Sequence, residues 1–178
     1  MTSPAQLNDP TLDRSALGAN AFKSVFRHHP AGVVVITTAV EGQPVGFTAT
    51  SLISVSADPP LLAFSVDAAS SAYRLMATAP TLVVNFLSAE QVELSARFAT
   101  SGIDRFATTD WWALPTGEPV LTGSAAWIRG EIVQRTPVGR SVLVSVLALE
   151  SEVAGDEAGA PLVYHDRRYH AIGEHTVL

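Results

Sequence analysis

Apolar runs separated by turn residues recur along most of the chain and predict strands. Ala31–Ala39 (AGVVVITTA) is rich in β-branched residues, as is typical of a buried strand. Residues typical of a turn, Glu41–Pro44, separate this run from Val45–Ser56, so the two runs are expected to pair as a hairpin. Asp58-Pro59-Pro60 should interrupt the pairing, because proline cannot donate to a ladder. The remaining predicted strands are Leu61–Val66, Thr81–Leu87, Ser124–Val133, Ser141–Leu149, Leu162–Tyr164 and Tyr169–Ile172.

Three short segments have helical spacing instead. Ala16–His28 places Leu17, Phe22, Val25 and Phe26 at helical intervals before Pro30. A second helix is expected to start at Ser70 or Ser71 and end near Thr78. A third should run from the capping box Ser88–Gln91 to Ala99. Thr100–Pro119 follows as a long irregular excursion with Trp111 and Trp112, and loops of this length are often functional.

The order of these elements predicts a mainly β domain. Six or seven strands at hairpin spacing, with two or three short helices, favour a closed or split antiparallel barrel. The alternation of strands and helices that marks a doubly wound α/β fold is missing. In Ser124–Val133, Ile128 and Ile132 should face one way, with Ala126 and Gly130, and Trp127, Arg129 and Glu131 the other.

Composition narrows the class of protein. The chain has 178 residues, 47% of them hydrophobic and 16% charged, which fits one globular domain with a proper core. A net charge of −6 argues against nucleic acid as a partner. The absence of cysteine excludes disulfides, thiolate nucleophiles and iron–sulfur clusters. We predict a flexible segment over 1–20, a domain over 21–173, no signal peptide or membrane span, and a cytoplasmic location.

Familiar catalytic motifs are missing, and one polar pattern stands out. The sequence has no dinucleotide-binding glycine motif, phosphate-binding loop or nucleophile elbow. Its five histidines lack the spacing of a metal site, so no metal is predicted.

Hydroxyls are dense in and beside the second predicted strand, at Thr48, Thr50, Ser51, Ser54 and Ser56. They form either a solvent-facing strand or a cradle for a phosphate and a polar ring edge. Ser70 and Ser71 either cap a helix or bind an anion. Arg74, Arg97 and Arg105 are candidate phosphate cations, or solvated surface residues.

An ordered set of segments carries a family resemblance over about residues 22–172. The segments are PAGVVVITT, GFTATSLISVSADPPLLAFSV, SSAYRLM, VVNFLSAEQVELSARFA, DRF, GEPVLTGSAAWIRGEIV and PLVYHDRRYHAI. Together they resemble the flavin reductase family of FMN-binding split barrels. The resemblance implies a six-stranded Greek-key barrel that forms a homodimer, with FMN near the interface, or FAD or riboflavin in its place. It also implies NADH or NADPH as donor and a flavin-dependent monooxygenase as partner.

The resemblance also assigns site residues by position. Thr48, Ala49, Thr50 and Ser51 would hold the phosphate and ribityl chain. Ser54, Val55 and Ser56 would border the isoalloxazine ring, and Pro30 to Val34, including Val33, would line its apolar side. Ser70, Ser71 and Arg105, followed by Phe106, would close on the phosphate. No catalytic acid or base is expected, because the flavin itself accepts the hydride.

One motif departs from the family. Gly139-Arg140-Ser141 stands where related reductases carry Gly-Asp-His beside the nicotinamide nucleotide. If a nucleotide binds beside Arg140 and Ser141, the arginine should favour NADPH, and the missing histidine should slow the reaction. Two alternatives stay open. One is a module that carries or stores FMN, or senses redox state, without a nicotinamide site. The other is an oxidoreductase of the same barrel that takes another small substrate or a deazaflavin.

Overall fold

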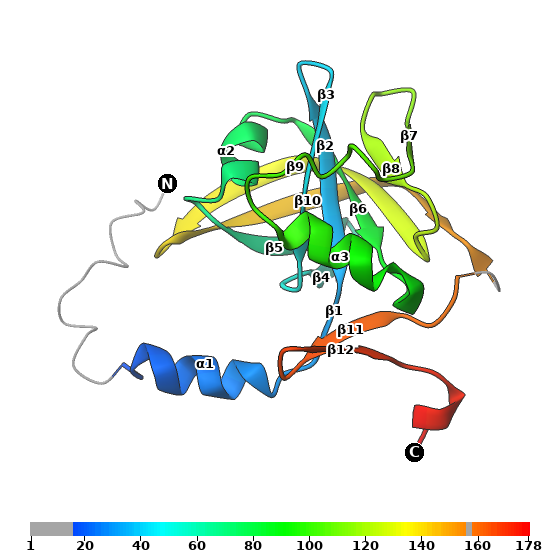
Figure 1. The fold of residues 1–178 in the computed structure, drawn as a ribbon. Coiled ribbons are helices and arrows are strands. Elements are labelled where there is room, and N and C mark those ends of the chain that lie inside the picture. Colours follow the sequence, from blue (N-terminus) through cyan, green and yellow to red (C-terminus); the bar gives the residue numbers. More distant parts are fainter. Residues whose placement is uncertain (1–15, 156–157) are drawn as a thin grey trace.

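The computed structural model describes residues 16–155 and 158–178, and its centre is one curved antiparallel sheet of seven strands. The strand order is β3-β2-β6-β9-β10-β5-β4 (Figure 1). The bounds are β2 Val34–Val40, β3 Gln43–Ala49, β4 Ile53–Ala57, β5 Pro60–Asp67, β6 Thr81–Phe86, β9 Ala126–Val138 and β10 Ser141–Val153. The sheet curls round one apolar interior, which confirms a mainly β split barrel.

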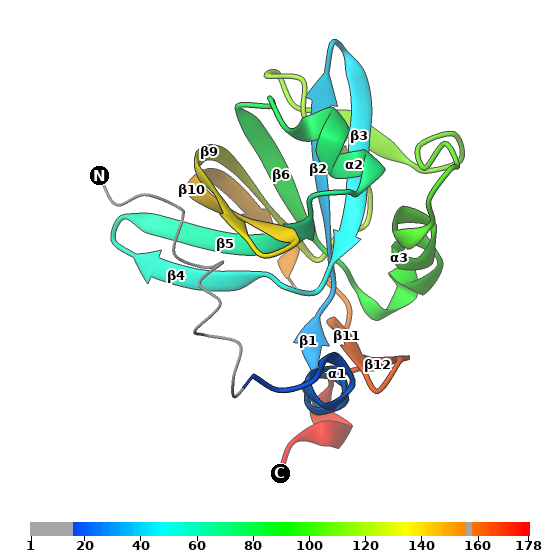
Figure 2. The ribbon, with the colours of Figure 1, turned by 90° about the vertical axis from the view of Figure 1, so that its left-hand side faces the viewer.

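Alternating apolar positions fill the interior of this barrel. Phe47 on β3 and Phe64 on β5 meet across it with ring centroids 6.1 Å apart, although their strands lie toward opposite edges of the sheet. The short helix α2 (Ser71–Met76) adds the buried Ala72 and Met76 to the same core. The β4–β5 hairpin extends away from the barrel and leaves Ile53 exposed (Figure 2).

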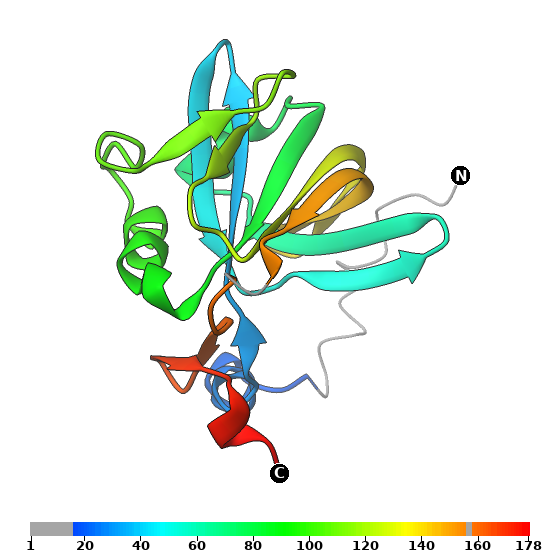
Figure 3. The same cartoon turned by 90° about the vertical axis from the view of Figure 1, so that its right-hand side faces the viewer.

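A second layer lies over the outside of the barrel at one side. It contains the 3-10 turn η3 (Ala89–Gln91), helix α3 (Val92–Ala99), and the two-stranded sheet of β7 (Trp111–Ala113) and β8 (Pro119–Leu121) (Figure 3). Phe98 of α3 is fully buried beneath this layer. Trp127 is buried on the outer face of β9, where its ring meets Trp112 edge-on at 6.1 Å. Both faces of β9 are therefore covered around Trp127, whereas Val133 and Val138 farther along the strand are exposed.

A small sheet extends from the opposite end of the barrel. It pairs β1 (Ala31–Gly32) with β11 (Leu162–His165), and β11 with β12 (Arg168–Ala171). Helix α1 (Ala19–Arg27) leads into β1 and buries none of its residues, so it stands apart from the barrel (Figure 1). A last 3-10 turn, η5, spans Glu174–Thr176. No helix in the described part of the chain is long and apolar enough to cross a bilayer.

Several sequence-based boundaries were wrong. Val45–Ser56 is not one strand, because the chain leaves β3 after Ala49 and crosses to the other edge of the sheet before β4 begins at Ile53. β9 continues beyond the predicted end at Val133 to Val138, so only two residues remain between β9 and β10. The strand count is also higher than six or seven, since the described residues form twelve. Of the predicted segment 1–20, residues 1–15 lie outside the described residues, and α1 begins within its end.

Candidate functional site

Two hollows meet where the chain crosses from β3 to β4. The smaller, which we call the hydroxyl hollow, has a volume of about 420 Å³ and lies between β3, β5 and the segment after α3. The larger, the helix groove, has a volume of about 1060 Å³ and lies between α1 and the sheet. Thr50, Ser51 and Ser65 line both, so the two form one continuous site.

The hydroxyl hollow collects many of the residues singled out in the sequence. Ala49 of β3, Ser70 before α2 and Arg105 are brought together from three separate parts of the chain, with Thr48, Thr50 and Ser51. Ser65, Asp67 and Ser101 complete its polar lining. One cation among several hydroxyls is the donor chemistry that a phosphate group requires.

Not every hydroxyl in this hollow can donate to a ligand. Thr48 donates to the Ser95 carbonyl at 2.7 Å and so ties β3 to α3. Ser51 donates to the Ser65 carbonyl at 2.9 Å and accepts the Ser65 N–H at 3.0 Å. Each hydroxyl has one proton, and phosphate oxygens need donors. Thr48 and Ser51 therefore shape the hollow, and their own protons are already used.

The other hydroxyls that line this hollow donate no hydrogen bond to another described residue. Ser70 is the N-cap residue of α2, yet its side chain makes no capping hydrogen bond. Helix capping, the simpler explanation for Ser70, is therefore not what its hydroxyl does. Thr50 and Ser101 also line the hollow, and neither is a hydrogen-bond donor to the described protein. These three hydroxyl protons thus remain for a ligand, as does that of Ser65, which lines both hollows.

Arg105 supplies the positive charge. Its Nε donates to the Thr100 carbonyl at 2.9 Å and its Nη1 to the Gly46 carbonyl at 2.8 Å. Burial lowers its pKa from the ordinary value, but a guanidinium stays protonated near neutral pH. Two backbone bonds fix the orientation of the plane and leave Nη2 without an acceptor in the described protein. Asp67 in the same hollow has its own partners, the Ala69 N–H at 2.8 Å and Arg140 at 4.0 Å.

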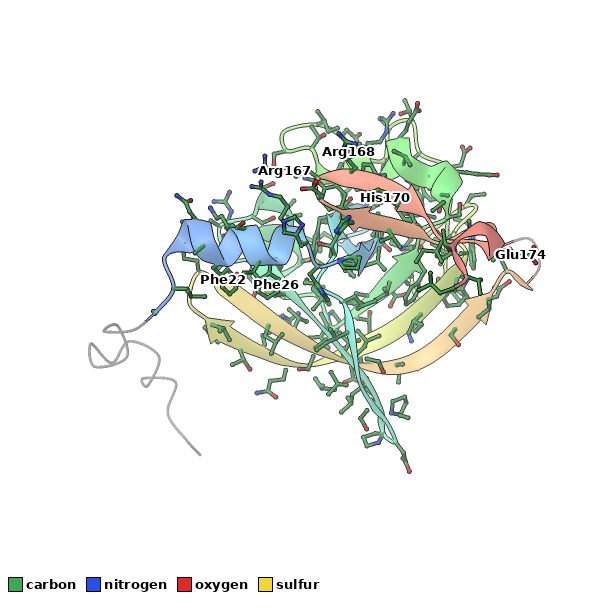
Figure 4. The ribbon with its side chains drawn as sticks, turned by 90° about the horizontal axis from the view of Figure 1, so that it is seen from below. Phe22, Phe26, Arg167, Arg168, His170 and Glu174 are labelled. Carbon is green, nitrogen blue, oxygen red and sulfur yellow. The ribbon has the colours of Figure 1, made fainter. Side chains whose placement is uncertain are left out.

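The helix groove has a different character. Phe22 and Phe26 of α1, with ring centroids 4.6 Å apart, form one wall. Ile53 and Leu143 on the sheet form the other, and Pro30 and Ser141 also line the groove. Figure 4 shows the two phenylalanines on α1 and Arg167 beside the C-terminal end of that helix. Apolar walls that lead to a hydroxyl-rich end suit an aromatic ring system joined to a phosphate.

The structure places other predicted residues outside both hollows. Val33 and Val34 are in the core, at 3% and 2% exposure. Phe106 is buried against Phe98, with ring centroids 5.0 Å apart. Arg140 is solvent-exposed and faces Asp67. The others that line neither hollow are Ser54, Val55, Ser56, Ser71, Arg74 and Arg97.

Sequence reasoning missed several lining residues. Ser101 follows α3 closely, and its position just before Arg105 was a usable signal. The helix groove is also lined by Lys23, Arg27 and Arg167, and no local sequence pattern predicts this. They meet because Asp166 N–H donates to the Arg27 carbonyl at 3.0 Å, a contact between segments far apart in the chain.

A buried ion pair lies elsewhere, under the β7–β8 layer. Arg129 Nε donates to Glu118 Oε1 at 3.0 Å, and Thr116 donates to the same carboxylate. Burial on its own would raise the pKa of Glu118. Hydrogen bonds from Thr116 and Thr81 and the charge of Arg129 outweigh burial, so the pKa lies below its ordinary value. Neither residue lines a hollow, which makes this pair structural.

Comparison with known proteins gives a consistent result. The sequence profile of the flavin reductase like domain matches residues 26–173. The chain is 43% identical over 155 residues to an NADH:FMN oxidoreductase of Rhodococcus erythropolis, covering 85% of this chain and 81% of that protein. It is 36% identical over 120 residues to the reductase subunit of a flavin-dependent monooxygenase from Rhodococcus jostii, covering 67% and 62%. The crystal structure of a flavin reductase domain protein from Arthrobacter sp. FB24 superposes with a TM-score of 0.82 at 36% identity, covering 88% and 96%.

Proposed function

The chain belongs to the flavin reductase-like family, and we propose that it binds FMN and reduces it with a nicotinamide nucleotide for a partner monooxygenase. The observation that carries the proposal is the hydroxyl hollow. Ser70, Thr50 and Ser101 have protons to give there, and Arg105 is held in place beside them. This donor set fits a phosphate monoester, and the helix groove that continues from it has room for a ring system.

In this proposal the residues of the chain bind and orient, and the flavin supplies the hydride-accepting chemistry. Arg105 and the three hydroxyls hold the phosphate. The crossing segment between β3 and β4 borders the ring, because it lines both hollows. Pro30 and the apolar side chains of the groove exclude water from the ring. No acid or base is needed, since the chain only has to position two ring systems.

We propose NADH as the donor. The support is the name of the Rhodococcus relative, an NADH:FMN oxidoreductase, together with the position of Arg140. Arg140 was expected to attract the additional phosphate of NADPH. Its side chain is 90% exposed, faces Asp67 and lines neither hollow, while Ser141 next to it does line the helix groove. A preference for NADPH therefore has little support from the geometry.

We also propose a symmetric homodimer. β10 buries Val142 and Val144 on its inner face, yet Leu143 and Leu149 on other positions of this strand remain exposed. Isolated monomers rarely leave such apolar strands uncovered. Because Leu143 also lines the helix groove, a partner subunit on this surface would border the flavin site. The proposed location is the cytoplasm, where reduced nicotinamide nucleotides are available.

A flavin carrier without donor chemistry is the second candidate, and Gly139-Arg140-Ser141 favours it. Anaerobic mixing of the FMN-loaded protein with NADH separates the two. We expect the flavin absorbance to bleach, whereas a carrier would stay oxidised. The phosphate assignment is tested separately by comparing affinities for FMN and riboflavin, and equal affinities would contradict it.

A further inference from the structure

One end of the helix groove gathers positive charge. Lys23, the chain's only lysine, and Arg27 approach it from α1, and Arg167 approaches from the turn between β11 and β12. The described residues form two ion pairs, Arg129–Glu118 and Arg140–Asp67, and neither includes these three cations. In a chain of net charge −6, three exposed cations that pair with no carboxylate among the described residues line one cavity, together with a single aspartate, Asp166. Such a cluster favours an anionic ligand.

The turn that presents Arg167 is unfavourable for an arginine. His165 pairs with Arg168, so Asp166 and Arg167 are the two central residues of a tight hairpin. Their φ angles are +45° and +63°, both in the left-handed region. Turns of this kind favour asparagine or aspartate followed by glycine, because a Cβ atom is disfavoured there. Arg167 thus brings a guanidinium to the groove at a position where the backbone would prefer glycine.

The turn is also fixed to the helix. Asp166 N–H donates to the carbonyl of Arg27 at the end of α1, at 3.0 Å. This bond holds the tip of the hairpin against the helix, as Figure 4 shows. Cations from two elements are therefore held at one end of the groove, and the hydroxyl hollow opens from the same cavity at Thr50 and Ser51.

We propose that Lys23, Arg27 and Arg167 bind the diphosphate of the nicotinamide donor. The inference rests on the proposed reductase function and adds the site for the non-reacting half of the donor. Arg105 and the free hydroxyls take the phosphate of the flavin, so the second cationic cluster is available to another phosphate-bearing ligand. Guanidinium groups bind phosphate through paired hydrogen bonds, which gives the diphosphate both affinity and a fixed direction. This contact positions the donor. In related reductases the histidine of Gly-Asp-His would contribute to that positioning, and Gly139-Arg140-Ser141 lacks it.

The first test separates ligand binding from the fold. Arg167→Gly creates the favoured aspartate–glycine turn, so the melting temperature should stay the same or rise. Calorimetry on the FMN-loaded protein should show the Kd for NAD⁺ rising about tenfold, the scale of one charge-assisted contact. Arg168→Ala is the matched control, because Arg168 carries the same charge one residue away and lines neither hollow. An unchanged Kd in Arg167→Gly, or equal weakening in both variants, would overturn the proposal.

The second test uses a donor that lacks the diphosphate. In the double variant Lys23→Ala/Arg27→Ala, kcat/KM for NADH should fall at least tenfold, while the rate with dihydronicotinamide riboside stays unchanged. An equal loss with both donors would mean that the variant disturbs the flavin or the fold, and would overturn the proposal. If neither donor reduces the wild-type flavin, the proposed reductase function fails. Calorimetry with NAD⁺ then still decides whether the cationic cluster binds a dinucleotide.

Discussion

Two sides of the barrel use polar residues in opposite ways. Under the β7–β8 layer, polar groups bond to one another: Glu118 with Arg129 at 3.0 Å, and the Asn85 side chain with the Leu121 N–H at 2.9 Å. On the side of α1, charged residues are exposed, and a single backbone bond, from Asp166 to Arg27, holds the β11–β12 turn to the helix end. Apart from the buried Ser124 hydroxyl, which has no hydrogen-bond partner in the described protein, the first side pairs its polar groups without a ligand, whereas the second has unused donors and an open cavity.

This difference assigns ligand binding to a part of the chain other than the one that loop length alone would indicate. The excursion over Thr100–Pro119 was expected to be functional because it is long. Most of it is instead a cover, fixed to the strands below it by the Glu118–Arg129 pair and by the Thr37 hydroxyl, which donates to the Pro119 carbonyl. Only Ser101 and Arg105 bring this segment to the hydroxyl hollow. The helix groove is provided instead by α1, the β11–β12 turn and the sheet.

The largest effect should come from breaking the covered side. Glu118→Gln leaves the guanidinium of Arg129 buried without its counter-charge, which should cost about 3 kcal/mol of unfolding free energy. Urea unfolding measures the loss, and Glu150→Gln, on an exposed position of β10, is the control. FMN affinity of the folded protein should be unchanged. A large loss of affinity without a loss of stability would make this pair part of the site.

The same pair predicts a pH dependence. The pKa of Glu118 in the folded protein lies below its ordinary value of 4.5, so the folded state favours the ionised form. Its contribution to stability is full above that ordinary value and is lost as pH falls toward the folded pKa. Wild-type stability should therefore fall more steeply below about pH 4.5 than that of Glu118→Gln. Parallel curves from pH 6 to pH 3 would remove Glu118 from this role.

The contrast also explains what could be predicted from the sequence. Period-two patterns located most strands, because burial on one face decides that pattern locally. The break after Ala49 was missed, because Thr50–Leu52 has the mixed polar and apolar composition of a strand. Only the curvature of the sheet makes the chain cross there from one edge of the sheet to the other. The hydroxyls of Thr48 and Ser70 look alike in sequence. They differ only in the folded protein, where α3 brings the Ser95 carbonyl to Thr48, whereas tertiary packing leaves Ser70 without a partner among the described residues.

An intermediate effect should separate hydroxyls that face the ligand from those that hold the fold. Ser70→Ala removes a free donor, so FMN affinity should fall about tenfold, as for one hydrogen bond to a charged group, with little change in stability. Thr48→Val keeps the volume and removes the bond to the Ser95 carbonyl. It should lower the melting temperature and leave FMN affinity within about twofold. Fluorescence titration with FMN and thermal unfolding on both variants decide, and a reversed pattern would exchange the two roles.

The smallest effect should come from Arg140, which lies on neither side of the comparison. Its guanidinium is 90% exposed and stands 4.0 Å from Asp67, and exposed pairs of this kind contribute about 0–1 kcal/mol. Arg140→Asp should therefore change the ratio of kcat/KM for NADH and NADPH by less than about threefold. It places a second carboxylate beside Asp67, which lines the hydroxyl hollow, so FMN should bind slightly more weakly at low salt and normally at high salt. Arg140→Ala, which removes the cation without adding an acid, should leave the donor ratio unchanged. A tenfold shift of the ratio in both variants would instead make Arg140 a donor contact and would move the nucleotide from the α1 end of the groove toward the β9–β10 turn.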